Sequence, residues 1–141
     1  MLALGIDPGQ KRVGVAVCDE DGVIAMPRPA LILKSPAAIG ASVSALAKEL
    51  GAEHVVMGLP IDMSGREGLA AKKSRALAAS LRTLGLRVVL WDERASTVAA
   101  NRDLQRMGKN SREARALVDS TAACLLLQSW LDASPRARGG L

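Results

Sequence analysis

Apolar and polar positions along this chain first alternate in short segments. Residues 2–6, 13–17 and 23–26 are apolar runs joined by polar stretches that contain the turn residues Pro8 and Gly22. Short runs bounded by such turn residues are typical of antiparallel strands. We therefore expect the chain to begin with a meander of three strands.

Helical spacing of apolar residues alternates with strand patterns after this meander. Ser35 and Pro36 open a helical stretch that Gly51 closes, and a second helix precedes Gly85. The expected later elements are a helix to residue 50, a strand at 55–57, a helix at 69–84, a strand at 86–91, and helices at 95–107 and 111–131. Three antiparallel strands followed by alternating helix and strand predict an α/β fold with a mixed five-stranded sheet flanked by helices.

The length of 141 residues suits one domain, which we place at residues 1–132. Residues 133–141 are rich in Pro, Arg and Gly and are predicted to be a disordered basic tail. No apolar run approaches the roughly 20 residues of a membrane span, and the N-terminus lacks the basic region of a signal peptide. Cys18 and Cys124 are isolated in apolar surroundings, as expected of buried thiols, so we predict a cytoplasmic protein without membrane partners.

Positive charge is concentrated in the second half of the chain. Residues 1–64 carry five basic and seven acidic side chains, whereas residues 65–141 carry fourteen basic and seven acidic ones. A polyanion such as nucleic acid would meet that surface first, although solvated helices would carry the same charges. The chain has no Phe or Tyr and only two Trp, so aromatic platforms for stacking bases are few.

Three carboxylates stand where apolar elements end or turn inward. Asp7 follows the first predicted strand, Glu93 follows the last one, and Asp119 heads an apolar stripe of the final helix that includes Ala122 and Ala123. Ligands of such sheets gather at the carboxyl ends of central strands, and the two alanines would let the helix approach the sheet. Buried carboxylates are costly unless cations compensate them, so their convergence indicates a metal site.

Each of these acids also has a structural explanation. Asp7 could start a turn, Glu93 could pair with a nearby Arg, and Asp119 could pair with Arg115. The glycine-rich loop at residues 62–68 could hold a phosphate through backbone amides and Arg66, or it could be a mobile connection. The only histidine, His54, lies beside a predicted strand and is interpreted as structural.

Four sequence blocks stand in order along the chain: Gly5-Ile6-Asp7-Pro8-Gly9 with Lys11-Arg12-Val13-Gly14-Val15-Ala16, Gly58-Leu59-Pro60 with Gly65 and Glu67-Gly68, Asp92-Glu93-Arg94, and Val118-Asp119-Ser120-Thr121-Ala122-Ala123. Together they resemble the YqgF/RuvX family of Holliday-junction-resolvase-like proteins, which have a ribonuclease H fold. The resemblance covers residues 2 to about 131. The family's first block often has an aromatic residue where this chain has Pro8.

The resemblance implies a metal-dependent endonuclease that hydrolyses phosphodiester bonds in structured nucleic acid. The family is linked both to maturing the 5′ end of precursor 16S rRNA in ribosome biogenesis and to resolving four-way DNA junctions. Its acidic positions fall on Asp7, Glu93 and Asp119, with Asp92 as a candidate fourth acid. Carboxylate oxygens suit Mg²⁺ or Mn²⁺, and no cluster of His or Cys offers a zinc site.

The expected contacts to nucleic acid join the basic positions of the family blocks to the basic groups of the second half. They are Lys11, Arg12, Arg66, Lys72, Lys73, Arg75, Arg94, Arg106, Lys109 and Arg112. Resolution of a junction would favour a homodimer, because two symmetric cuts need two sites.

Two other functions begin from the same residues. The block around Asp7 also resembles the first phosphate motif of actin-like ATPases and sugar kinases, but those proteins clasp ATP between two lobes and this chain has room for one. A non-catalytic RNA-binding adaptor would keep the fold and the basic surface. ATP turnover would support the first alternative, and tight RNA binding without metal-dependent cleavage would support the second.

Overall fold

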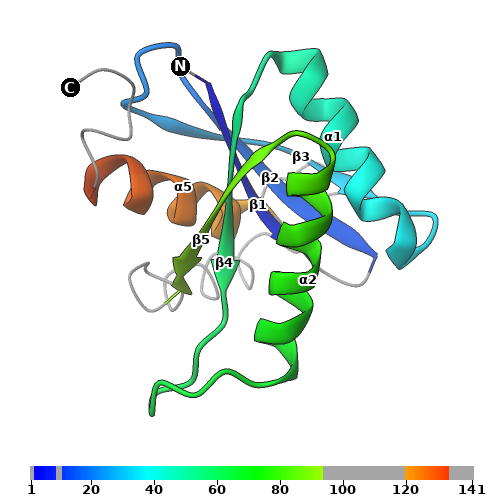
Figure 1. Cartoon of the computed structure of the whole chain (residues 1–141). Helices are drawn as coiled ribbons and strands as arrows, with labels where there is room; N and C mark the ends of the chain where they lie inside the picture. Colours follow the sequence, from blue (N-terminus) through cyan, green and yellow to red (C-terminus); the bar gives the residue numbers. More distant parts are fainter. Residues whose placement is uncertain (1, 9–10, 94–119, 134–141) are drawn as a thin grey trace, which may run out of the picture.

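A computed structural model of the chain describes residues 2–8, 11–93 and 120–133 (Figure 1). The five strands are β1 (Ala3–Pro8), β2 (Arg12–Cys18), β3 (Ala25–Ile32), β4 (His54–Leu59) and β5 (Arg87–Asp92). The helices are the short 3₁₀ turn η1 (Pro36–Ala38), α1 (Ile39–Leu50), α2 (Leu69–Thr83) and α5 (Thr121–Ala133). The predicted helix at 95–107, residues 111–119 of the last predicted helix and most of the predicted tail lie outside the described residues.

The strands form one mixed sheet in the order β3-β2-β1-β4-β5. β1 pairs with β2, and β2 with β3, in antiparallel fashion, whereas β1 with β4 and β4 with β5 are parallel. This arrangement confirms the predicted mixed five-stranded sheet. The parallel pairing brings the carboxyl ends of β1, β4 and β5 to one edge, because Ile6 lies beside Met57 and Gly58 beside Trp91.

Helices cover both faces of the sheet. α1 and α2 pack on one face and α5 on the other (Figure 1). The larger apolar core, with Leu4, Met57 and Leu81, lies under α1 and α2, and a second core lies under α5. Each face of a central strand therefore supplies one core, and only the strand ends are left to build a site.

α5 approaches the sheet closely at Gly5. A Cβ built on Gly5 would lie 2.6 Å from the carbonyl oxygen of Ala123 and 2.8 Å from Leu127 Cβ. Ala123 is fully buried, as the predicted stripe required, and Ala122 is partly exposed. Two small residues thus set the distance between α5 and β1.

The third strand differs from the prediction. We expected it at residues 23–26, but β3 runs from Ala25 to Ile32 and contains Pro27 and Pro29. The prediction followed the apolar run alone, which stops at Met26, and proline cannot donate to a ladder. β3 is an edge strand, where proline is tolerated, so it continues through both residues.

Two further boundaries differ slightly from the predictions. Residues 36–38 form η1, and the α-helix begins only at Ile39. β1 extends to Pro8, so Asp7 lies within the strand, opposite Gly14, and not after it. Gly51 and Gly85 follow α1 and α2 with positive φ angles, as expected of residues that end helices.

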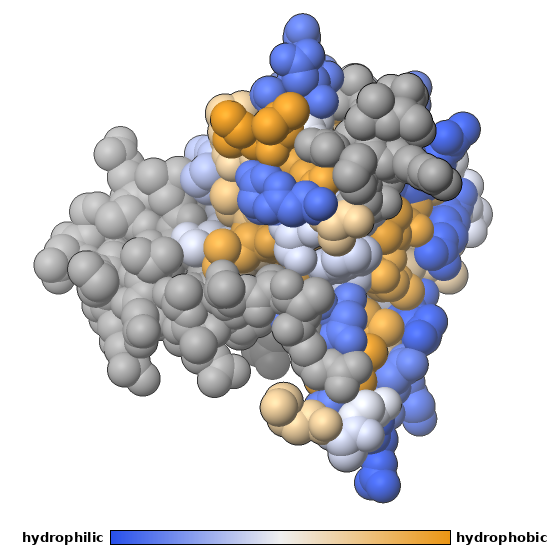
Figure 2. All heavy atoms as spheres, turned by 90° about the vertical axis from the view of Figure 1, so that its left-hand side faces the viewer, coloured by the Kyte–Doolittle hydropathy of each residue, from blue (hydrophilic) through white to orange (hydrophobic). Residues whose placement is uncertain are grey.

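Two observations concern the surface and the cysteines. No helix in the described part of the chain is long and apolar enough to cross a bilayer. Cys18 and Cys124 carry free thiols, as predicted. Figure 2 views the face that carries α5, where apolar and hydrophilic side chains lie interspersed on the surface.

Candidate active site

Asp7 lies near the carboxyl end of the central strand β1, in a setting that disfavours its charge. The ladder with β2 continues past it through Pro8, which fixes its backbone. Burial, and secondarily the negative charge of Glu93, raises the pKa of Asp7 to about 6. A carboxyl group with such a pKa at the end of a sheet is a candidate functional group.

Glu93 directly follows β5, and its carboxylate lies against Gly58 at the end of β4. A Cβ built on Gly58 would lie 2.5 Å from Glu93 Oε1 and 2.9 Å from its Cγ, so only glycine leaves this space open. Burial, followed by the charge of Asp92, raises the pKa of Glu93 above its usual value. The sheet therefore brings together two of the three predicted acids, and Asp119 lies outside the described residues.

Asp7 and Glu93 line one cleft of about 740 Å³. The cleft opens on the face that carries α1 and α2, above the carboxyl ends of β1 and β4. Its lining residues are Asp7, Pro8, Lys11, Leu33, Lys34, Ser35, Ile39, Gly58, Pro60, Ala70, Lys73, Ser74, Leu77 and Glu93. Carboxylates, lysines, hydroxyls and apolar side chains thus share one concave surface, as in ligand-binding sites.

The predicted nucleic-acid contacts divide into three groups. Lys11 and Lys73 line the cleft. Arg12, Arg66, Lys72 and Arg75 are exposed but are not among its lining residues. The rest lie outside the described residues: Arg94, Arg106, Lys109 and Arg112.

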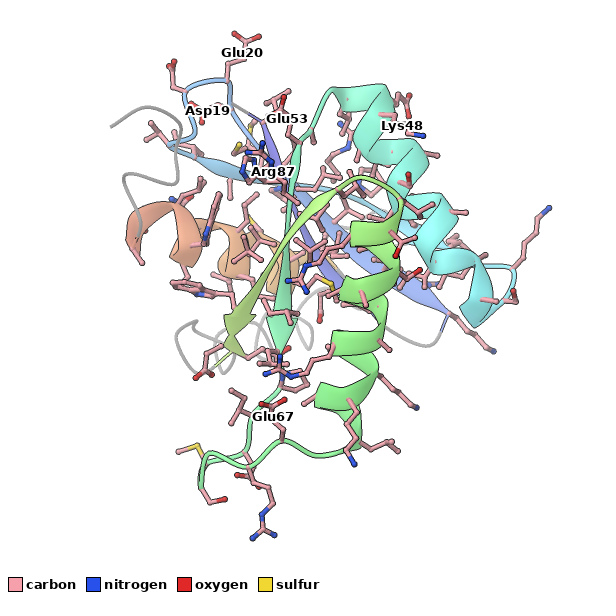
Figure 3. The ribbon with its side chains drawn as sticks, in the orientation of Figure 1. Asp19, Glu20, Lys48, Glu53, Glu67 and Arg87 are labelled. Atoms are coloured by element: carbon pink, nitrogen blue, oxygen red, sulfur yellow. The ribbon has the colours of Figure 1, made fainter. Side chains whose placement is uncertain are left out.

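Arg75 forms a two-point ion pair with Glu67. Its Nε and one terminal nitrogen donate to the two carboxylate oxygens over 2.6 Å and 2.8 Å. Figure 3 shows Glu67 beside the lower end of α2, in the segment that follows β4. The hydrogen bond and the positive charge of Arg75 lower the pKa of Glu67. Arg75 therefore ties the loop to α2 in addition to adding positive charge.

The loop at residues 62–68 is organised around Asp62. Asp62 Oδ1 accepts hydrogen bonds from the backbone amides of Ser64 and Arg66 and from the Ser64 hydroxyl. Ile61 and Glu67 form a short antiparallel bridge that closes the loop. The amides of Ser64, Gly65 and Arg66, which we expected to be available for a phosphate, thus already donate to Asp62.

The sequence analysis missed Lys34, Ser35 and Ser74 as residues of the cleft, and it missed the packing role of Gly58. Lys34 and Ser35 follow the true end of β3, so the early end that we gave this strand concealed them. Ser74 follows Lys73 on α2, and nothing in the sequence indicates that this part of the helix faces a cleft. Gly58 belonged to a recognised block, but its contact with a residue 35 positions later has no local signal.

The donor set fits a hard divalent cation. Asp7 and Glu93 offer carboxylate oxygens, the ligands that Mg²⁺ and Mn²⁺ prefer, and a cation held by both would offset the repulsion that adds to the effect of burial on the pKa of Asp7. Within residues 2–8, 11–93 and 120–133, no group of three or more His, Cys, Asp or Glu side chains could hold a metal. The described part of the chain therefore offers two candidate ligands, Asp7 and Glu93.

A mixed sheet in the order β3-β2-β1-β4-β5 with helices on both faces is a ribonuclease H-like fold. The family model for RuvX, described as Holliday junction resolvase, matches residues 1–133. The chain belongs to this family. It is accordingly a nuclease, a hydrolase that acts on phosphodiester bonds of nucleic acids.

Relatives and solved structures agree with this assignment. A Myxococcus xanthus protein named "Putative pre-16S rRNA nuclease" is 42% identical over 134 residues, which cover 94% of this chain and 89% of the relative. A Mycolicibacterium paratuberculosis protein of the same name is 43% identical over 131 residues, which cover 92% of this chain and 78% of the relative. The solved structure of T. thermophilus RuvC in complex with a Holliday junction substrate shares the fold, with a TM-score of 0.60 at 17% identity. The match covers 96% of this chain and 97% of RuvC.

Proposed function

We propose that this protein is a metal-dependent endonuclease that matures the 5′ end of precursor 16S rRNA in the cytoplasm. The observation that carries the proposal is that two carboxylates, Asp7 and Glu93, line the same cleft. Gly58 leaves the space that the glutamate side chain fills. The named relatives support rRNA as the substrate. The family description favours a four-way DNA junction as the second candidate.

In the proposed site, Asp7, Glu93 and Asp119 hold Mg²⁺ or Mn²⁺. When bound, the cation supplies positive charge for the phosphoryl oxygens and lowers the pKa of a water. Both acids line the cleft and are partly buried, which limits the water that competes for their carboxylates. Lys11 lines the same cleft and attracts the phosphate toward the acids. Asp92 stays a candidate fourth acid, and a homodimer remains a prediction.

A side-by-side cleavage assay tests this function. A precursor 16S rRNA leader and a synthetic four-way DNA junction are incubated with the protein in Mg²⁺ and in Mn²⁺. We expect cleavage of the leader to be faster, and Asp7→Asn and Glu93→Gln to abolish it. Glu53→Gln is the matched control, because Glu53 lies at the opposite end of β4 from the cleft (Figure 3). Preference for the junction would favour the second candidate, and equal activity of Asp7→Asn would exclude the proposed site.

A further inference from the structure

The cleft extends beyond the two acids and carries two lysines that no sequence block includes. Lys34 follows β3, at the edge of the sheet, and Lys73 lies on α2, which packs over β4 and β5. The cleft thus spans the distance from the end of the edge strand to the helix above the opposite half of the sheet. These two lysines therefore come from separate elements and share one concave surface with the acidic pair.

The chemistry around these lysines suits a sugar-phosphate chain. Ser35 follows Lys34 in the chain and Ser74 follows Lys73, and all four residues line the cleft, so it presents both ammonium and hydroxyl groups. Ammonium and hydroxyl groups are donors to phosphate oxygens. Leu33, Ile39 and Leu77 complete the lining with apolar surface against which a base or sugar can pack without an aromatic platform.

The size of the cleft favours an unpaired strand of nucleic acid over a duplex. A volume of about 740 Å³ is in the range of pockets that enclose small ligands, roughly 300 to 1,000 Å³. Duplexes are contacted by protein elements that project into their grooves, whereas concave pockets receive unpaired or extruded nucleotides. A paired strand would hold its bases away from the apolar lining.

We propose that the cleft is a site for unpaired nucleotides, in which Lys34 and Lys73 hold phosphates next to the scissile bond. This inference rests on the proposed function and specifies its substrate as a strand that is single at the cut. The recognition is independent of cleavage, because the lysines are not ligands of the cation. Binding can therefore be measured without turnover.

Binding of one labelled RNA strand, alone and annealed to its complement, tests the site. Fluorescence anisotropy with Asp7→Asn protein should show at least about tenfold tighter binding of the single strand, a difference of about 1.4 kcal/mol. Lys34→Ala and Lys73→Ala should each remove most of this preference. They should also lower the slope of log affinity against log salt concentration, measured with the single strand, by about 0.7 for each lost phosphate contact.

Two control lysines make the test specific. Lys72→Ala removes the same charge from the neighbouring position on α2, outside the cleft lining, and should weaken both RNA forms alike while keeping the preference. Lys48 lies in the last turn of α1, at the opposite end of this helix from Ile39 in the cleft lining (Figure 3). Lys48→Ala should change neither the affinity for the two RNA forms nor the preference between them. Equal affinity for both forms, or equal loss of preference in Lys72→Ala and Lys73→Ala, would overturn the proposal. Selective binding without any metal-dependent cleavage by the wild-type protein would instead overturn only the proposed function.

Discussion

The Glu93 carboxylate occupies the space that a side chain at position 58 would need, because a Cβ on Gly58 would lie 2.5 Å from its Oε1. Gly58→Ala must therefore displace the glutamate. The side chain is flexible, so we expect a loss of stability below about 1 kcal/mol, together with a loss of cleavage of about tenfold or more. Cleavage rates and urea denaturation of the same preparation measure both effects.

Gly5→Ala is the natural comparison for Gly58→Ala. The new methyl group would meet the backbone of Ala123 and Leu127 Cβ, neither of which can rotate away. We expect this overpacking to cost about 1 to 3 kcal/mol of stability. If Gly58→Ala lost as much stability as Gly5→Ala and kept its activity, the contact with Glu93 would have no functional meaning.

The stability of the metal-free protein should depend on the charge of Asp7. Burial, followed by the charge of Glu93, raises its pKa to about 6, above the value near 4 of the unfolded chain. The ionised carboxylate therefore destabilises the fold, fully above pH 6 and not at all below pH 4. The difference of about two units corresponds to roughly 2 to 3 kcal/mol.

Asp7→Asn should remove this pH dependence. In EDTA, the difference in unfolding free energy between variant and wild type should favour the variant at pH 7.5 and shrink as the pH falls to 4. Mg²⁺ should stabilise the wild type more than the variant. A difference that is constant from pH 4 to 7.5 would show that Asp7 ionises freely in the folded protein.

Ser120, just before α5, connects this helix to β2 and β3 next to the irregularity in their pairing. Its hydroxyl accepts a hydrogen bond from the Val15 amide over 3.0 Å and donates to the Arg28 carbonyl, where the β2–β3 register shifts between Val13 and Val15. Ser120→Ala would leave a buried amide unsatisfied, at a cost of about 1 to 3 kcal/mol. Chemical denaturation should show this loss, whereas Thr83→Ala, which removes an exposed hydroxyl, should stay within about 0.5 kcal/mol.

Arg75 should act on the loop more than on nucleic acid. Arg75→Ala breaks the ion pair with Glu67, so the segment at 60–68 should be cut faster by a protease such as trypsin at Arg66. Lys72→Ala changes the charge equally without touching this pair and is the control. Equal rates of proteolysis in the two variants would argue that the pair does not hold the loop.

The sequence predicted the arrangement of the sheet because its signals are local. Short apolar runs, helical spacing and the glycines after α1 and α2 depend on neighbouring residues, and the alternation of helix and strand then favours parallel pairing. Parallel strands align their carboxyl ends, so the meeting of Asp7 with Glu93 followed from the same reasoning. The sheet is as predicted, and Asp7 and Glu93 line one cleft, whereas Asp119, the third acid of the expected convergence, lies outside the described residues.

Other features depend on contacts between distant segments. Whether Pro27 and Pro29 end a strand depends on whether the strand lies at an edge, which no local pattern reveals. The error at β3 also hid Lys34, since a residue must be placed at a strand end before it can be expected in a cleft. The fit between Gly58 and Glu93 is a matter of packing, and sequence spacing does not report it.

The same prolines bear on how molecules of this protein meet one another. Residues 25 and 27 of β3 lie two positions apart before the register shift and share one side of the strand, where the Ala25 amide donates to Gln128; Pro27 and Pro29 have no amide hydrogen to donate. An approaching strand from another molecule would find no run of amides to pair with. The sheet is thereby protected from growth at this edge during synthesis and folding, when chains are most exposed to aggregation.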